Sequence, residues 1–301
     1  MIDLPAALRA YRQLVEGALE AAVGESGEPD GGLRDAMRYS LGGGGKRIRP
    51  LLLLAAGEAA GGSSADLLPF ACAVEMIHCY SLIHDDLPAM DDDELRRGRP
   101  TSHVRFGEGL AILAGDALLT DAFRIMCAAA ARSRRPQAAI GAVAEIATAV
   151  GAAGMVGGQA ADLAAEGGDA SVELVESIHR RKTGALIIAA VRAGALLAGC
   201  EGPALRHLSR YGERVGLAFQ VADDVLDAVG TTAQTGKREG RDRARGKQTF
   251  PRLLGIDGAR RYARDLSAEA LVELEDFSAR ADPLREIARF VVERACGSGD
   301  S

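Results

Sequence analysis

Two aspartate-rich motifs in the chain have the composition of a site for a hard metal ion. The first, "DDLPAMD", runs from Asp85 to Asp91, and the second, "DDVLD", runs from Asp223 to Asp227. Carboxylate oxygens without histidine or cysteine suit Mg²⁺, which takes one or two carboxylates and completes its shell with water and substrate phosphates. Carboxylates that repel one another in apolar surroundings also need a cation. The motifs therefore predict a magnesium site.

The second motif is expected to lie on a regular helix. Residues i and i+4 of a helix share one face, so Asp223 and Asp227 would point the same way. The alternative is a solvated acidic helix face, but the surrounding "GLAFQVADDVLDAV" is too apolar for an exposed surface.

The first motif needs a different backbone. Asp85 and Asp91 are six residues apart, which is not one face of a straight helix. Pro88 has no N–H to donate within a helix. We therefore expect the helix to end or distort at "LPAM", so that Asp91 returns beside Asp85. On spacing alone Asp92 competes with Asp91, and a charged loop after a helix is the alternative for the whole motif.

Basic residues accompany both motifs. Glycines let backbone N–H groups approach a phosphate, and helix N-termini favour anions. The stretch "GGGGKRIRP" combines both features, "RRKTGAL" puts a lysine and a threonine among apolar residues, and "TGKREGRDRARGK" is glycine-rich and basic. Together they predict a cavity that binds polyphosphate through metal ions and direct contacts. The candidate contacts are Lys46, Arg47, Arg49, Arg96, Arg97, Lys182, Thr183, Lys237 and Lys247.

The elements that position these residues are expected to be helices. Apolar residues recur at helical spacing, alanine is abundant, and alternating strand patterns are almost absent. No linker or internal repeat divides the chain, so 1–301 is expected to be one all-α domain. The polar stretch 230–250 is expected to be a functional or disordered loop. Helices are expected near 3–23, 29–41, 47–61, 65–86, 108–132, 137–154, 171–199, 202–230 and 282–296.

Composition excludes several other classes. A net charge of −6 argues against a nucleic-acid binder, which would show a basic face. There is no uncharged apolar run long enough for a membrane span, and the N-terminus lacks the pattern of a signal peptide. The five cysteines contain no C-x-x-C pair, which argues against a disulfide framework or a zinc site. A cytoplasmic protein is expected.

Seven stretches in order along the chain resemble the trans-type polyprenyl diphosphate synthases, and the bacterial farnesyl diphosphate synthases most closely. They are "GGKRIRP", "HCYSLIHDDLPAMDDDELRRGRPTSH", "ILAGDALLTDAF", "GGQAADL", "IHRRKTGAL", "GLAFQVADDVLDAVG" and "GKREGRDRARGKQTFP". The resemblance implies the isoprenoid synthase fold, a single large helical bundle around a central cavity, usually as a homodimer. It also implies Mg²⁺-dependent condensation of isopentenyl diphosphate with an allylic diphosphate, with three metal ions when substrate is bound.

The resemblance also implies roles for individual residues. The metal ligands would be Asp85, Asp91 and Asp223, assisted by Asp86 and Asp227. The allylic diphosphate would contact Arg96, Lys182 and Lys237, while Thr183 and Gln220 would lie near the developing cation. The isopentenyl diphosphate pocket would hold Lys46, Arg49, His78 and Arg97. A core histidine is the alternative for His78, and a structural role is expected for His84.

Product length is expected to depend on Tyr80, five residues before Asp85 and about 7.5 Å away along a helix. In synthases of this family an aromatic residue here accompanies a short product, which favours farnesyl diphosphate (C15). Ser81 is small enough to let a chain pass, and simple core packing is the alternative for Tyr80. Geranyl or geranylgeranyl diphosphate synthase is the alternative within the family.

Three rivals are disfavoured. A metal phosphohydrolase that uses the His84–Asp85 pair would need a histidine pattern that the five histidines lack. A terpene cyclase would be richer in aromatics and would carry a different second metal motif. A non-catalytic subunit of a heteromeric synthase would be expected to lose an acidic motif, and this chain keeps both.

Overall fold

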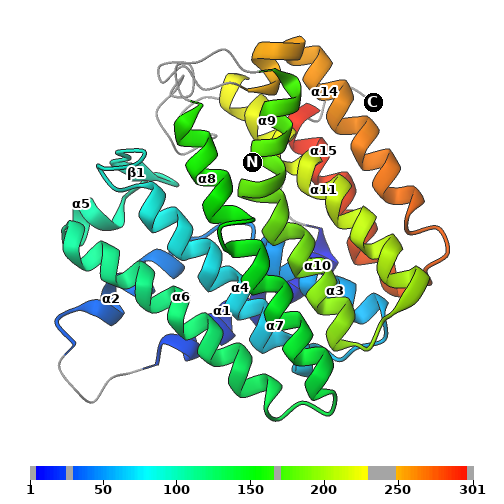
Figure 1. Cartoon of the computed structure of the whole chain (residues 1–301), viewed down its shortest axis with the longest axis horizontal. Helices are drawn as coiled ribbons and strands as arrows, with labels where there is room; N and C mark the ends of the chain where they lie inside the picture. Colours follow the sequence, from blue (N-terminus) through cyan, green and yellow to red (C-terminus); the bar gives the residue numbers. More distant parts are fainter. Residues whose placement is uncertain (1–4, 25–29, 166–170, 230–248, 297–301) are drawn as a thin grey trace.

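The chain folds into a bundle of helices, as the sequence predicts (Figure 1). The computed structural model describes residues 5–24, 30–165, 171–229 and 249–296. In this part the strands are limited to β1 (Leu95–Arg96) and β2 (Arg99–Pro100), an antiparallel hairpin. The helices are α1 (Ala6–Val23), α2 (Leu33–Leu41), α3 (Ile48–Ala59), α4 (Ser64–Asp85), α5 (Ser102–Phe106), α6 (Glu108–Ala130), α7 (Pro136–Val150), α8 (Met155–Ala164), α9 (Val172–His179), α10 (Ala185–Leu197), α11 (Gly202–Val229), α14 (Phe250–Val272) and α15 (Asp282–Cys296). The fold class is all-α.

The predicted helices differ from the observed ones in four places. The expected helix 171–199 is continuous in space, but Arg180–Gly184 forms a π-helical turn, η1, between α9 and α10. The expected 137–154 ends at Val150, and a separate helix, α8, follows. The short α5 was not predicted, and neither was the long α14, which is kinked by Gly255 at a φ of 71°. Charged residues and internal glycines interrupt the apolar spacing of α14, so the sequence pattern does not indicate a helix there.

Two hydrophobic clusters form the core and meet at α3 and α10. One cluster contains residues of α1, α2, α4, α6 and α7, and the other contains residues of α11, α14 and α15. The four leucines 51–54 are fully buried, with Leu53 and Leu54 in the first cluster and Leu51 and Leu52 in the second. A helix buried on all sides is apolar all round, which explains the leucine run.

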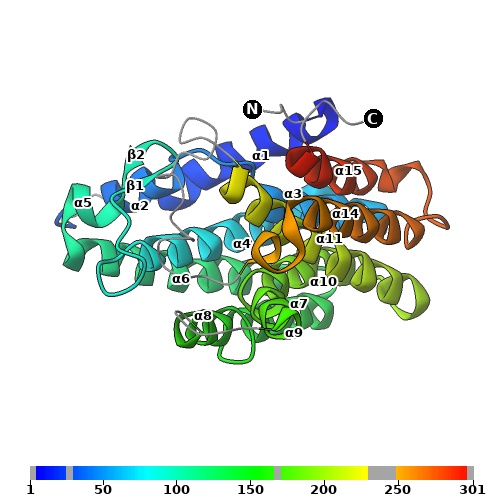
Figure 2. The same cartoon turned by 90° about the horizontal axis from the view of Figure 1, so that it is seen from above.

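Close backbone packing joins α3 to α10. A Cβ at Gly194 of α10 would lie 2.1 Å from the Leu53 carbonyl oxygen, so this position accepts only glycine. In the second view, α8 and α9 lie at one edge of the bundle, and α1 and α15 lie at the opposite edge (Figure 2). The helices that carry the two aspartate motifs, α4 and α11, run between these edges.

Two stretches are long and apolar enough to cross a membrane by length and composition alone, Ser64–Asp85 and Pro136–Ala164. The first is α4, whose apolar window is 67% buried inside the fold. The second is divided between α7 and α8 by a turn at 151–154. A core helix passes the same test, so these stretches are weak evidence for a membrane span.

Candidate active site

The first aspartate motif folds back on itself at the end of α4. The Asp91 amide donates to the Asp85 carbonyl at 2.8 Å, and the Asp93 amide donates to the Asp86 carbonyl at 3.0 Å. The expected return of Asp91 to Asp85 is therefore confirmed. Asp92 adopts a left-handed φ of 49° and is exposed, whereas Asp91 is half-buried. The backbone thus favours Asp91 over Asp92 as the partner of Asp85.

Asp85 lies in an environment that disfavours its negative charge. Burial is the main cause of its raised pKa; the Lys182 ammonium opposes this rise, and Asp91 adds to it. Two carboxylates held together in this way need a cation. The donor set fits Mg²⁺, because it contains oxygen atoms and no thiol or imidazole. Among the described residues, no group of three or more His, Cys, Asp or Glu side chains is arranged to hold a metal ion.

The second aspartate of the first motif is already paired. Asp86 is 3% exposed and accepts from Arg96, with Nε 2.8 and 2.9 Å from its two oxygens and Nη2 2.5 Å from one of them. The pair joins the end of α4 to the hairpin at β1. Asp86 thus orients the arginine that we expect at the allylic diphosphate, and its own role as an auxiliary metal ligand stays a prediction.

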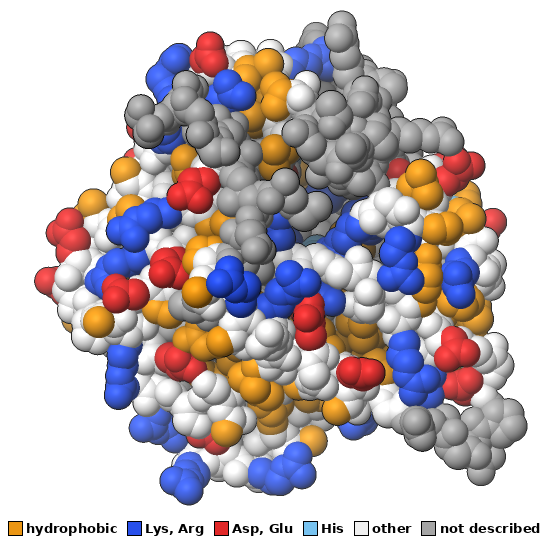
Figure 3. All heavy atoms as spheres, turned by 180° about the vertical axis from the view of Figure 1, so that it is seen from behind, with side chains coloured by type: hydrophobic (Ala, Val, Ile, Leu, Met, Phe, Trp, Pro, Cys, Tyr) orange, Lys and Arg blue, Asp and Glu red, His pale blue; other side chains and the backbone are white. Residues whose placement is uncertain are grey.

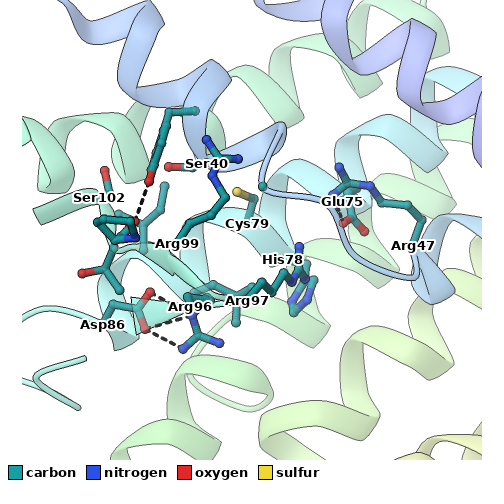
Figure 4. A pocket seen from close by; sticks show the side chains of 16 residues that line it. Ser40, Arg47, Glu75, His78, Cys79, Asp86, Arg96, Arg97, Arg99 and Ser102 are labelled. Atoms are coloured by element: carbon teal, nitrogen blue, oxygen red, sulfur yellow. Dashed lines mark hydrogen bonds and ion pairs between the residues drawn. The ribbon is translucent and has the colours of Figure 1, made fainter. Parts of the chain in front are cut away.

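A basic pocket lies beside the first motif, between α2, α4 and the hairpin (Figure 4). Figure 3 shows Lys and Arg side chains gathered at a depression near the middle of one face of the molecule. The pocket is lined by Tyr39, Ser40, Gly43, Arg47, Glu75, His78, Cys79, Leu82, Ile83, Asp86, Arg96, Arg97, Arg99, Pro100, Thr101 and Ser102.

The pocket concentrates positive charge around His78. Burial lowers the pKa of His78 well below its usual value, and the guanidinium groups of Arg49, Arg97, Arg96 and Arg47 lower it further, in that order. These groups hold His78 neutral, and their combined field favours an anionic ligand. The pocket has the electrostatics of a diphosphate site.

The arginines of this pocket differ in how they are held. Arg47 is 6% exposed, pairs with Glu75 at 2.7 Å and donates to the Leu41 carbonyl, so it is a structural residue. Arg97 donates to the Gly44 carbonyl and points toward His78 (Figure 4). Arg49 does not line this pocket, but its charge acts on His78 from beside it. Its Nε atom, like that of Arg47, is buried and has no hydrogen-bond partner among the described residues.

Lys46 comes from the loop before α3, and its Nζ atom lies 6.0 Å from the centroid of the Phe290 ring. The side chain therefore also contacts α15. Its predicted role at isopentenyl diphosphate stays a prediction.

The π-helical turn η1 presents Lys182 toward the first motif. Lys182 donates to Asp162 of α8 at 2.6 Å, and its ammonium also interacts with Asp85. A Cβ at Gly158 would lie 2.3 Å from the Lys182 amide nitrogen, so glycine is required for α8 to approach the turn. π-Turns widen a helix locally and occur at functional sites. Here the turn places a lysine and a threonine together, and α8 supports it from outside.

The second motif forms a hydrogen-bond network in the interior of the fold. Asp224 accepts from Gln220 at 2.9 Å and from the Phe250 amide at 3.1 Å, and Gln220 accepts from Thr183 at 2.8 Å. Asp223 is half-buried, and its charge acts on Arg49, which lies beside the basic pocket. The predicted residues Thr183 and Gln220 are therefore in direct contact, and Asp223 lies within electrostatic range of Arg49.

Several residues that organise the site were not predicted. Glu75 binds Arg47, Asp162 binds Lys182, and Asp224 binds Gln220. Asp162 and Asp224 lie in the motifs "GGQAADL" and "DDVLD", so their signal was present, but spacing alone does not show which aspartate turns inward. Lys237 and Lys247 lie outside the described residues.

Tyr80 and His84 lie in the last turns of α4, just before the first motif. Tyr80 is 7% exposed, and its ring meets the His84 ring edge-on at 5.5 Å. Burial raises the pKa of Tyr80, and the Asp85 charge adds to the rise. His84 lies 3.1 Å from the Ile112 carbonyl of α6, in agreement with a structural role.

Known proteins are similar to this chain in sequence and in fold. A family model described as polyprenyl synthetase matches residues 31–283. Farnesyl diphosphate synthase of Escherichia coli (strain K12) is 48% identical over 97% of this chain and 99% of its own length. Geranylgeranyl diphosphate synthase of Cyanophora paradoxa is 46% identical over 94% of each protein. The crystal structure of an FPP/GFPP synthase from Zymomonas mobilis matches with a TM-score of 0.85 at 37% identity, over 95% of this chain and 97% of that one.

The helical bundle, the paired aspartate motifs and the basic pocket thus define a prenyltransferase with the isoprenoid synthase fold. The chain belongs to the polyprenyl synthetase family.

Proposed function

We propose that this prenyltransferase is a farnesyl diphosphate synthase, which condenses isopentenyl diphosphate with dimethylallyl and then geranyl diphosphate. The observation that carries the proposal is the pairing of a partly buried carboxylate site at Asp85 and Asp91 with a neighbouring arginine pocket around His78. One site suits a diphosphate held through metal ions, and the other suits a diphosphate held by direct contacts. Two such sites are what a condensation of two diphosphates requires.

The chemistry needs charge stabilisation rather than a protein nucleophile. The C–O bond of the allylic diphosphate breaks, the double bond of isopentenyl diphosphate forms the new C–C bond, and a proton then leaves to the departing diphosphate. Bound Mg²⁺ would neutralise the leaving diphosphate, held there by Asp85, Asp91 and Asp223. Lys182 and Arg96 add positive charge at the same end, and preorganised charge of this kind is a large term in catalysis.

Water exclusion and orientation come from the surrounding helices. Arg97 and Arg49 would orient isopentenyl diphosphate, and Lys46 would assist from the loop before α3. Thr183 and Gln220 would lie beside the allylic carbon that becomes positive. Lys237 is proposed as a further allylic diphosphate contact on its position in the sequence alone.

Product length is proposed from Tyr80. Its buried ring lies near Asp85, where a diphosphate would be held, so a tail running back along α4 would meet it. The named relatives make both farnesyl and geranylgeranyl diphosphate, and this ring favours the shorter product. We further propose a homodimer in the cytoplasm with 1–301 as one catalytic domain.

The test is incubation with isopentenyl diphosphate and each allylic diphosphate, with Mg²⁺ or with EDTA. Chromatography of the dephosphorylated alcohols should show farnesol as the main product with Mg²⁺ and no elongation with EDTA. A C20 alcohol would instead identify a geranylgeranyl diphosphate synthase. A cyclic hydrocarbon, or no elongated product at all with Mg²⁺, would contradict the proposal.

A further inference from the structure

We infer that Asp224 is a positioning residue that sets the direction of a hydrogen-bond chain, so that the Thr183 oxygen faces the reaction as an acceptor. The inference rests on the proposed function, because it concerns stabilisation of the allylic cation. It assigns a role to an aspartate that lies next to a proposed metal ligand and has both of its own oxygens engaged within the protein.

The direction of the chain follows from what a carboxylate can do. Asp224 is 5% exposed, and a carboxylate accepts hydrogen bonds but donates none. One of its oxygens faces the side-chain amide of Gln220 at 2.9 Å, so that amide must present its NH₂ group. The Gln220 carbonyl oxygen is thereby turned to the other side, toward Thr183.

The next link is the hydroxyl of Thr183. Its oxygen lies 2.8 Å from the Gln220 carbonyl, which can only accept, so the single hydroxyl proton is donated to Gln220. The side of the Thr183 oxygen that is left carries lone pairs. Thr183 contacts Gln220, which shares a face of α11 with the proposed metal ligand Asp223 three residues on, and so lies close to the proposed allylic site. Lone pairs aimed at an electron-deficient carbon stabilise it electrostatically.

Neighbouring groups fix the orientation of Asp224 itself. Its second oxygen accepts from the Phe250 amide at 3.1 Å and lies 3.3 Å from His179 Nε2. The His179 ring stacks on the Phe250 ring at 5.5 Å. These contacts leave Asp224 facing the start of α14 and the end of α9, so its orientation does not depend on a bound metal ion.

The experiment reverses the chain and then restores it. In Asp224→Asn the side-chain carbonyl can still accept from the Phe250 amide, but the new NH₂ group faces Gln220. The Gln220 amide must then turn over, and its NH₂ group points at Thr183, which loses its acceptor. Adding Gln220→Glu restores an acceptor for both Thr183 and the asparagine amide. The double variant therefore has the wild-type direction at Thr183.

The expected kinetics follow from the direction of the hydrogen bond at Thr183. Asp224→Asn should lower kcat by about tenfold to a hundredfold, since misoriented groups in a preorganised site cost factors of this size. Gln220→Glu alone places two carboxylates face to face and should lower kcat at least as much. The double variant should recover at least about tenfold over the worse single variant. Asp257→Asn, the same change at an exposed site of α14, is the control and should match wild type.

A binding measurement separates the direction of the hydrogen-bond chain from a general structural role of Asp224. The probes are an allylic diphosphate analogue with an ammonium group at the position that becomes cationic, and its neutral isosteric counterpart. Wild type and the double variant should prefer the ammonium analogue, and Asp224→Asn should lose about tenfold of this preference while it keeps its affinity for the neutral one. If Asp224→Asn does not fold, Thr183→Val provides the same comparison, because it removes the acceptor oxygen.

Three results would overturn the inference: wild-type kcat in a folded Asp224→Asn enzyme, no recovery in the double variant, or an unchanged analogue preference in Asp224→Asn or Thr183→Val. Each is distinct from failure of the proposed function, which would appear as a wild-type enzyme that makes no elongated product.

Discussion

The two aspartate motifs reach the same arrangement by different backbone routes. In each, the second aspartate turns into the protein: Asp86 is 3% exposed and Asp224 is 5% exposed, while the preceding Asp85 and Asp223 remain partly accessible. The first motif needs a helix end and a reversed turn to bring in Asp91. The second remains on the regular helix α11. One aspartate of each motif is thus left accessible to a ligand, and its neighbour is bound within the protein.

The two buried aspartates, Asp86 and Asp224, which we call the inward aspartates, differ in the partners they bind. Asp86 binds a charged guanidinium, which itself belongs to the proposed substrate site. Asp224 binds neutral amides, which direct a hydroxyl. Under the proposed function, the charged partner would add positive charge at the diphosphate, and the neutral partner would set the direction of a hydrogen bond near the reacting carbon. The comparison teaches that identical residue types in matching motifs can support opposite ends of one reaction.

The largest expected effect on rate comes from replacing Asp85 or Asp223, the aspartates that remain partly accessible. Asp85→Ala or Asp223→Ala should each lower kcat by about three orders of magnitude or more, because each removes an electrostatic element in a preorganised site. Circular dichroism should show an intact fold. Near-wild-type kcat in one of them at saturating Mg²⁺ would show that the two motifs are not equivalent.

The next largest effect is expected at Gly158, where α8 packs against the π-helical turn. Gly158→Ala should lower kcat by about a hundredfold, because the added methyl group would push the Lys182 backbone out of place. Gly141→Ala, at a helical glycine with no atom within 4 Å of the added carbon, is the matched control and should retain full activity. Equal activity of the two variants would show that the position of Lys182 tolerates movement.

The substrate pockets can be separated by steady-state kinetics. Arg97→Ala should raise KM for isopentenyl diphosphate by about tenfold to a hundredfold, since a charge-assisted contact contributes about 1.5–3 kcal/mol. Lys182→Ala should mainly affect the allylic substrate or kcat. If Arg97→Ala weakened only the allylic substrate, the assignment of the basic pocket to isopentenyl diphosphate would be wrong.

Replacing Asp86, the inward aspartate of the first motif, should lower the stability of the protein. Asp86→Asn weakens a bidentate ion pair and should reduce the free energy of unfolding by about 1–3 kcal/mol. Denaturant titration measures this loss, with exposed Asp257→Asn as the control. A stability equal to that of the control would mean that Arg96 finds another partner, such as Asp93 at 3.7 Å.

The smallest effect on rate is expected at Tyr80. Tyr80→Ala should keep most of the activity and shift the product from C15 toward C20 or longer, because the ring would no longer block a growing tail. The alcohols obtained after phosphatase treatment, with isopentenyl diphosphate in excess, report the change. An unchanged C15 product from a folded enzyme would leave Tyr80 as a core residue with no influence on chain length.

The sequence predicted the helical fold and the return of Asp91, because helical periodicity and proline chemistry act locally. That Thr183 and Gln220 share one site was implied by the family resemblance and not by local pattern. The sequence did not predict the partners of the inward aspartates. Whether Asp224 meets a metal ion or an amide depends on α14, which lies beyond the stretch 230–248 in the chain, and the short-range pattern contains no record of that contact. Asp162 was missed for the same reason, since its partner is 20 residues away on another helix.

The burial of α3 on all sides has a consequence for folding. Because the leucines at 51–54 contribute to both hydrophobic clusters, neither cluster can open without exposing the same helix. The two halves of the bundle should therefore unfold cooperatively, with the amides of α3 among the slowest to exchange with solvent deuterium. The helix that separates the two halves in space is also the one that joins them in a single transition.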